Sequence, residues 1–163
     1  MHRLFKHLMC NRHRVEKLFS KSDLQAIAQA ITESETKHSG EIVFYIEPSL
    51  SLGQIFAKMT SRERALEGFS AMRVWDTEAN NGVMLYFLVA ERKFEIIADR
   101  GVNRLVDQSF WNEISRAISQ QFSERAFTRG VIEAIQKISE VLQKHFPPRL
   151  GDRNELADEV QIV

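Results

Sequence analysis

The stretch of residues 75–101, WDTEANNGVMLYFLVAERKFEIIADRG, constrains the fold more than any other part of the chain. It contains two apolar runs, Val83–Ala90 and Phe94–Ala98, with only Glu91–Lys93 between them. A continuous run of β-branched and aromatic residues is typical of a strand that is covered on both faces. Because the link is short, we expect the two runs to pair as an antiparallel hairpin.

The rest of the chain predicts one further strand and several helices. Glu41–Glu47 predicts a strand that Pro48 ends, and a helical pattern between Ser51 and Met72 separates this strand from the hairpin. A helix before the strand is expected to begin at Ser22, with Gln25 completing a capping box. Apolar stripes predict this helix and two more after the hairpin: Leu24, Ile27, Ala28 and Ile31; Trp111, Ile114, Ile118 and Phe122; Val131, Ile135, Ile138 and Leu142.

This order of elements predicts an α/β fold. A strand–helix–strand unit requires a right-handed parallel crossover, and helices on both faces of a small mixed sheet give a three-layer α/β/α sandwich. At 163 residues the chain is long enough for one domain with tails. We expect a basic N-terminal arm over residues 1–20, the α/β/α domain over 21–148, and a polar acidic tail over 149–163.

Charge and cysteine content exclude several classes of protein. The formal net charge is zero, which gives no indication of nucleic acid as a partner. Cys10 is the single cysteine, so no intramolecular disulfide can form, and a cytoplasmic location is expected. The longest apolar run, Val83–Ala90, is too short to span a bilayer as a helix, so no transmembrane segment is expected.

The hairpin is expected to bring distant polar residues together at its open end. A two-residue turn at Glu91-Arg92 would pair Ala90 with Lys93 and place Asn81 beside Asp99. If the first strand is parallel to Val83–Ala90, Glu41 opens at the same edge of the sheet. Asp76 enters this edge from the preceding loop, and Asp107 leaves it by the following one.

Carboxylates that converge in this way repel one another unless a cation neutralises them. The expected donors are all oxygens, from Asp76, Asn81, Asp99, Glu41 and Asp107, without histidine or thiolate. Such a set favours Ca²⁺ or Mg²⁺ over zinc. The alternative is that these are ordinary loop residues, with Asp99 paired to Arg100 or Arg104 and residues 80–82 forming a turn.

The basic N-terminal arm leaves two interpretations open. Leu4, Leu8 and Val15 are the apolar points of a short helix, which could anchor to a membrane surface or simply dock on the domain or fray. His7, Cys10 and His13 have near-helical spacing, but a metal site there would lack a fourth ligand.

Several motifs together resemble the TPM domain family over about residues 20–150. They are SGEIVFYIE, R-x-R-A-x-E-x-F, the stretch VWDTEANNGVMLYFLVAERKFEIIADRG, W-x-x-I, and the Gly130 helix that ends in HFPP; the tail GDRNELAD resembles the short cytoplasmic bacterial branch. The resemblance implies a Rossmann-like α/β/α sandwich and divalent-cation binding, usually of calcium. By this resemblance the cation falls on Asp76, Asn81 and Asp99, with Glu41 and Asp107 nearby. It also implies that some members are acid phosphatases.

Three functions follow as hypotheses. The first is a non-catalytic, cation-binding accessory domain that a protein partner recognises. The second is a metal-dependent phosphatase in which Arg100 or Arg104 holds the phosphate; the chain has no ready-made nucleophile motif, which ranks this hypothesis second. The third is a membrane-surface adaptor that uses the basic arm.

Overall fold

The sheet is built on the strands that the sequence predicts. In the computed structural model, which describes residues 2–148 and 155–163, β1 (Ile42–Glu47) and β2 (Val83–Leu88) pair in parallel, with Ile42 opposite Val83. β3 (Lys93–Ala98) runs antiparallel to β2, and a short β4 (Gln161–Ile162) pairs in parallel with the other side of β1. The strand order is therefore β3-β2-β1-β4, a small mixed sheet with one antiparallel pair.

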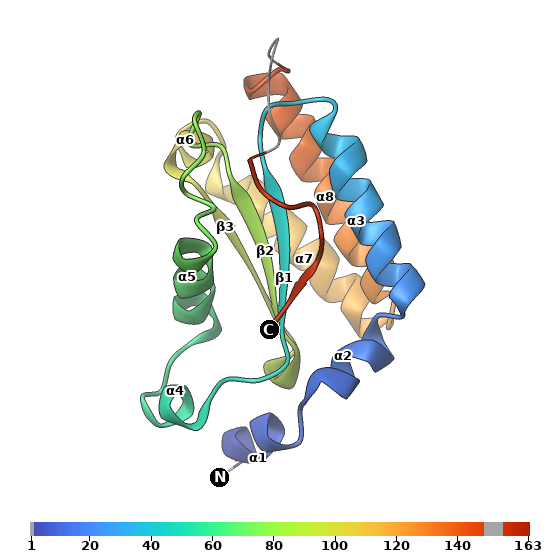
Figure 1. The fold of residues 1–163 in the computed structure, drawn as a ribbon, viewed down its shortest axis with the longest axis vertical. Coiled ribbons are helices and arrows are strands. Elements are labelled where there is room, and N and C mark those ends of the chain that lie inside the picture. The colour runs from blue at the N-terminus through green and yellow to red at the C-terminus, as the bar shows by residue number, and fades with distance from the viewer. Residues whose placement is uncertain (1, 149–154) are drawn as a thin grey trace.

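Helices cover both faces of this sheet and complete the predicted three-layer sandwich (Figure 1). One layer is formed by α3, α7 and α8, and the opposite layer by α5 with the short α4 beyond it. The helical segments are α1 (His2–Leu8), α2 (Arg12–Leu18), α3 (Lys21–Glu35), α4 (Leu52–Phe56), α5 (Ser61–Ala71), η1 (Val89–Glu91), α6 (Arg100–Asn103), α7 (Gln108–Ser123) and α8 (Phe127–His145).

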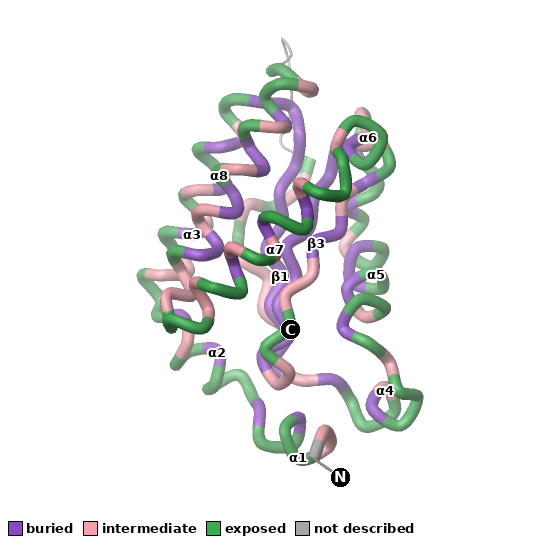
Figure 2. The backbone as a smooth tube through the Cα atoms, turned by 180° about the vertical axis from the view of Figure 1, so that it is seen from behind, coloured by how far each residue is buried: buried purple, intermediate pink, exposed green. Residues whose placement is uncertain are grey.

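Alternation along the strands divides the core in two, since successive side chains of a strand point to opposite faces. Phe44 and Phe87 lie in the larger cluster under α3, α7 and α8, while Tyr45 and Tyr86 stack at 5.8 Å between ring centroids on the α5 face. Every residue of β1 and β2 is buried, which explains why both strands read as continuous apolar runs (Figure 2).

Two local predictions were wrong. The N-cap of α3 is Ser20, whose side chain accepts from the Asp23 N–H while Asp23 accepts from the Ser20 N–H. Ser20-x-x-Asp23 and Ser22-x-x-Gln25 both fit a capping box, and the acidic residue at the first turn favours the earlier one. The predicted pairing of Ala90 with Lys93 is also wrong: η1 occupies the link, so Leu88 pairs with Lys93 instead.

The two ends of the chain both pack on the domain. Val15 and Phe19 are fully buried, so the segment that leads into α3 contributes to the larger core cluster. Val160 and Ile162 pack against the same cluster beside β4, a strand that the polar composition of the tail did not indicate. Within the described residues, no helix has the length and apolar character needed to cross a membrane.

Candidate metal site

The opening edge of the sheet brings three distant stretches together. The N–H of Val83 donates to the carbonyl oxygen of Glu41 at 2.8 Å, which continues the parallel pairing by one residue beyond β1 and β2. The N–H of Asp99 donates to the carbonyl oxygen of Gly82 at 2.8 Å, so Asp99 lies opposite Gly82, the residue that follows Asn81, at the end of the hairpin. The register differs from the predicted one, but it keeps Asn81 and Asp99 at the same end of the hairpin.

The loop before β2 is held tightly against the start of α6. Asn80 has a left-handed backbone conformation with φ 53°, which an asparagine tolerates better than most residues. A Cβ added to Gly101 would lie 2.3 Å from the Asn80 carbonyl oxygen, so only glycine fits there. The N–H of Asn81 donates to Thr77 Oγ1 at 3.1 Å, which folds residues 77–81 into a closed turn.

Asn81 is a buried polar side chain at this edge. Its relative exposure is 1%, and its amide Nδ2 donates to the Ser39 carbonyl oxygen at 2.8 Å. This bond assigns the amide orientation, because a carbonyl can only accept. The other amide atom, Oδ1, is buried and has no hydrogen-bond partner among the described residues.

Asp99 is also buried at this edge. It caps α6, and its Oδ1 accepts from the Arg100 N–H at 2.7 Å. Its Oδ2 is buried, and the part of the chain that the structure describes supplies no donor to it. An unsatisfied buried acceptor costs about 1–3 kcal/mol, more when it is charged. A hard cation is the kind of ligand that would satisfy such an oxygen.

The remaining predicted carboxylates at the loops have partners of their own. Asp76 is exposed and forms an ion pair with Arg73, three residues earlier on the same loop. Asp107 is exposed and caps α7 by accepting from the Ser109 N–H at 2.8 Å. Hydrogen bonds from Ser109 hold the pKa of Asp107 below its ordinary value. That Asp76 and Asp107 bind a metal ion stays a prediction.

The two arginines proposed for phosphate binding are both exposed. Arg100 Nε donates to Asn80 Oδ1 at 3.2 Å, so its guanidinium lies beside the loop that carries Asn81. Arg104 is the C-cap of α6, and its N–H donates to the Arg100 carbonyl oxygen. Of the two, Arg100 is the one that the structure ties to this edge.

Glu41 lies in a separate acidic cluster beside the C-terminal segment. Its carboxylate is buried and accepts from the N–H groups of Glu155 at 3.0 Å and Leu156 at 3.2 Å. Glu35 accepts from the Ile42 N–H at 3.0 Å. Burial raises the pKa of both glutamates; for Glu35 the nearby Glu41 and Asp158 add to the effect, and the pKa reaches about 9. Protonation of the carboxylates and hydrogen bonds from backbone N–H groups therefore reduce the charge repulsion within this cluster.

Sequence reasoning missed the groups that hold Asn81 and Glu41 in place. Thr77, which accepts from Asn81, stands within the quoted WDT motif and could have been noticed there. Nothing in the sequence indicated a role for Ser39, because it contacts Asn81 through a backbone carbonyl from a different loop. Glu155 and Leu156 could not be placed from sequence, because a loop path brings them to Glu41.

Clusters of metal-ligating side chains are absent from the described ranges, the opening edge of the sheet included. Among these residues there is no group of three or more His, Cys, Asp and Glu side chains suited to hold a metal ion. The H-x₂-C-x₂-H residues serve other contacts: His7 bonds Leu50 and Glu91, and His13 contacts Glu16. Cys10 is buried, which raises the pKa of its thiol.

Comparison with known proteins agrees with this fold. The family model described as the TPM domain matches residues 14–141, most of the chain. The chain belongs to the TPM domain family. This confirms the family expected from the sequence motifs, and the match includes β1, β2, β3 and the loop that carries Asn81.

Two solved structures resemble this TPM domain. The NMR structure of BA42 from the psychrophilic bacterium Bizionia argentinensis has a TM-score of 0.79 and 29% identity, covering 89% of this chain and 95% of that one. The N-terminal domain of cg2496 from Corynebacterium glutamicum has a TM-score of 0.55 at 13% identity, covering 76% of this chain and 74% of that one; it supports the fold alone. No curated protein matches the chain significantly.

Proposed function

We propose that this TPM domain binds a divalent cation, Ca²⁺ or Mg²⁺, at the opening edge of its sheet and acts as a non-catalytic accessory module. The observation that carries the proposal is the pair of buried, unpartnered oxygens in the described structure, Asn81 Oδ1 and Asp99 Oδ2. Oxygen from a carboxylate and from an amide is the donor chemistry that both cations prefer.

The residues at this edge fit such an ion. Asn81 and Asp99 would hold it from the end of the loop and from the start of α6, and the carbonyl oxygens of Ala79 and Asn80 face the same glycine, Gly101. A bound cation would supply positive charge to one buried carboxylate. Asp76 could join only by giving up its ion pair with Arg73.

Cation binding at this point would have a structural consequence. It would tie the loop of residues 76–81 to the end of β3, and so fix the surface that the loop presents. A ligand that binds only the folded state raises its stability by mass action. The partner that recognises this surface is expected to be a protein.

The experiment is thermal unfolding with increasing CaCl₂ or MgCl₂. We expect saturating cation to raise the melting temperature of the wild type and of Asp107→Asn, the matched control. Asp99→Asn retains an acceptor for the Arg100 N–H but removes the charge, so its melting temperature should respond little. An unchanged wild-type melting temperature, or an equal rise in Asp99→Asn, would exclude this site.

The contact of Arg100 with Asn80 favours a second candidate function, which is catalytic. An exposed guanidinium beside a cation-binding edge could hold an anionic group such as the phosphate of a phosphomonoester. This second candidate, a metal-dependent phosphatase, predicts hydrolysis of a chromogenic phosphate ester. Loss of that hydrolysis in both Asp99→Asn and Arg100→Gln would support it, whereas hydrolysis that survives in both would exclude this edge as the active site.

A further inference from the structure

Helix α1 exposes two of its apolar residues to solvent and buries a histidine, while Leu4 packs against the core cluster on the α5 face. His7 is buried with 3% exposure, whereas Phe5 and Leu8 are 63% and 64% exposed. An amphipathic helix at the surface of a globular protein ordinarily has the opposite arrangement. Exposed apolar groups are common singly, but a helix that exposes Phe5 and Leu8 while it buries His7 needs a specific cause.

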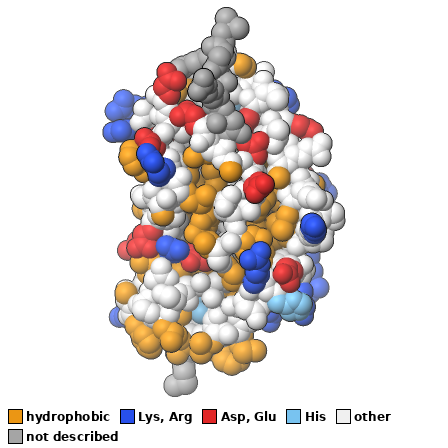
Figure 3. Space-filling model, in the orientation of Figure 1, with side chains coloured by type: hydrophobic (Ala, Val, Ile, Leu, Met, Phe, Trp, Pro, Cys, Tyr) orange, Lys and Arg blue, Asp and Glu red, His pale blue; other side chains and the backbone are white. Residues whose placement is uncertain are grey.

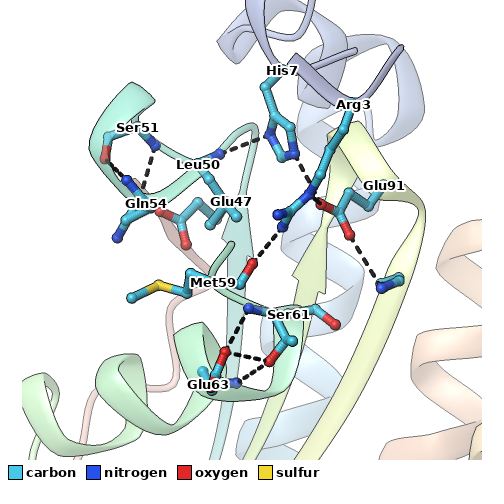
Figure 4. A network of polar contacts seen from close by, with 12 residues as sticks. Arg3, His7, Glu47, Leu50, Ser51, Gln54, Met59, Ser61, Glu63 and Glu91 are labelled. Atoms are coloured by element: carbon cyan, nitrogen blue, oxygen red, sulfur yellow. Dashed lines mark hydrogen bonds and ion pairs between the residues drawn. The ribbon is translucent and has the colours of Figure 1, made fainter. Parts of the chain in front are cut away.

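A network of polar contacts fixes α1 in this orientation (Figure 4). Arg3 Nε and His7 Nε2 both bond Glu91 Oε1, at 2.6 and 3.0 Å, and Lys93 pairs with the other oxygen of Glu91. His7 Nδ1 accepts from the Leu50 N–H at 3.0 Å, and Arg3 also donates to the Met59 carbonyl oxygen. Helix α1 is therefore anchored at the hairpin and on both sides of α4.

Helix α4 adds to the exposed apolar surface. Leu52 and Phe56 are 51% and 73% exposed, and α1 and α4 contact each other. Hydrophobic side chains gather at the lower end of the molecule over these two helices (Figure 3). We name this surface the apolar tip and define it as Phe5, Leu8, Met9, Leu52 and Phe56.

Positive charge dominates beside the apolar tip, where the largely buried Glu91 pairs with Arg3 and His7. The segments that carry it, residues 1–15 and 48–62, contain no Asp or Glu. Five exposed cations lie on these segments: Lys6, Arg12, Arg14, Lys58 and Arg62. Elsewhere the chain has 16 Lys and Arg against 22 Asp and Glu, so this end of the molecule is locally basic and apolar at once.

We propose that the apolar tip docks this TPM domain on a lipid bilayer that contains anionic phospholipids. Phenylalanine, leucine and methionine side chains would enter the boundary between headgroups and acyl chains, while Lys6 and Lys58 contact the anionic headgroups. A protein partner would be expected to place acidic side chains against these cations. A bilayer with anionic headgroups matches both the positive charges and the apolar side chains over one flat surface.

The position of the tip gives the docked protein a defined orientation. α1 contacts η1, which follows the closing end of β2, whereas Asn81 and Asp99 lie at the opening end of the same hairpin (Figure 1). A six-residue strand separates the two ends by about 20 Å. The bilayer would hold one end of the domain and leave the candidate metal site facing away from the membrane.

The experiment is flotation of the full chain with vesicles of phosphatidylcholine alone or mixed with phosphatidylglycerol. We expect the wild type to float with the anionic vesicles, less at high salt, and little with phosphatidylcholine alone. Phe5→Ser/Phe56→Ser should lower the vesicle partition about tenfold or more, since two half-exposed aromatic rings lose their burial. Lys6→Gln/Lys58→Gln should lower it by roughly 25-fold at low salt, about fivefold for each charge.

The matched control is Leu66→Ser/Leu105→Ser, which removes two exposed leucines outside the tip and should float like the wild type. Circular dichroism of each variant checks that it is folded. The proposal is overturned if the wild type does not float, or if folded Phe5→Ser/Phe56→Ser floats like the wild type. It is also overturned if sedimentation shows a wild-type dimer that this variant converts to a monomer, because the tip would then bind a second copy.

Discussion

Asp99 lies opposite Gly82, the residue that follows Asn81, because Asp99 donates its backbone N–H to the carbonyl oxygen of Gly82. The side chains of Asn81 and Asp99 each carry a buried oxygen without a partner among the described residues, and each is held by its other polar atom. The apolar hairpin thus does more than fill the core: its register determines which polar residues meet at its open end.

The close contact between the loop and α6 predicts opposite effects for two glycine substitutions. Gly101→Ala should destabilise the protein, because the new Cβ would lie 2.3 Å from the Asn80 carbonyl oxygen. Gly53→Ala should stabilise it by up to about 1 kcal/mol, since glycine is a poor helix former and nothing lies within 4 Å of the added Cβ in α4. Urea unfolding of both variants measures the difference, and equal stabilisation by both would contradict the close approach.

The acidic cluster predicts an unusual dependence of stability on pH. Burial raises the pKa of Glu35 from 4.5 to about 9, so the folded state retains a proton that the unfolded state releases. The stability that this group contributes is complete below pH 4.5 and is lost as the pH rises towards 9. The loss can reach about 1.4 kcal/mol for each pH unit.

Glu35→Gln provides the test, because glutamine keeps an acceptor for the Ile42 N–H and carries no charge. The variant should gain stability relative to the wild type between pH 5 and pH 8.5, measured by urea unfolding. Glu33→Gln, an exposed position on the same helix, is the control. Parallel pH curves for the wild type and Glu35→Gln would show that Glu35 is ionised in the folded protein.

The hairpin illustrates what the sequence could predict. The strand character of Val83–Leu88, the parallel pairing with Ile42–Glu47 and the position of Asn81 and Asp99 at the same end of the hairpin all follow from hydrophobic pattern and strand geometry. The turn itself was mispredicted, because η1 shortens β2 and shifts the pairing by two residues. A shift of two preserves the face of every side chain, so the prediction of the edge survived this error.

Residues that depend on loop paths could not be predicted. Glu41 was placed at the correct edge, but its carboxylate binds the N–H groups of Glu155 and Leu156, which reach it from the far end of the chain. The orientation of α1, which leaves apolar side chains exposed, could not be predicted either. The pattern of this helix alone does not tell which side meets the protein, and Glu91 decides this from another element.

Glu91 is expected to keep α1 docked over most of the pH range. Burial alone would raise its pKa, but hydrogen bonds from Arg3, His7 and Lys93 outweigh burial and lower it from 4.5 to about 2. This contribution to stability is present above pH 4.5 and is lost as the pH falls towards 2.

Glu91→Gln should therefore be less stable than the wild type at pH 6, and the difference should vanish towards pH 2 in urea unfolding. Hydrogen exchange of the α1 amides should accelerate in the variant at pH 6. Exchange in α1 that matches the wild type would show that apolar packing alone holds the helix.

A second buried polar group fastens α5 to the sheet. Arg64 Nε donates to Glu47 Oε2 at 2.8 Å, and the Tyr86 hydroxyl donates to the same oxygen at 2.8 Å. Arg64→Ala should cost about 3 kcal/mol, because the buried Glu47 carboxylate loses its cation. Tyr86→Phe should cost about 1 kcal/mol, and Glu67→Ala, which removes the exposed partner of Arg64, less than about 0.5 kcal/mol. A cost for Arg64→Ala no greater than that of Glu67→Ala, measured by chemical unfolding, would contradict this ranking.

The measurement that tests the cation site most directly is a Ca²⁺ titration followed by amide NMR, including the side-chain amide of Asn81. We predict that the signals of Asn81, Gly82, Asp99 and Arg100 shift in a saturable manner, and that Asp99→Asn abolishes the shifts. Spectra that do not change at saturating Ca²⁺ or Mg²⁺, or shifts confined to residues around Glu35, Glu41 and Asp158, would contradict a site at Asn81 and Asp99.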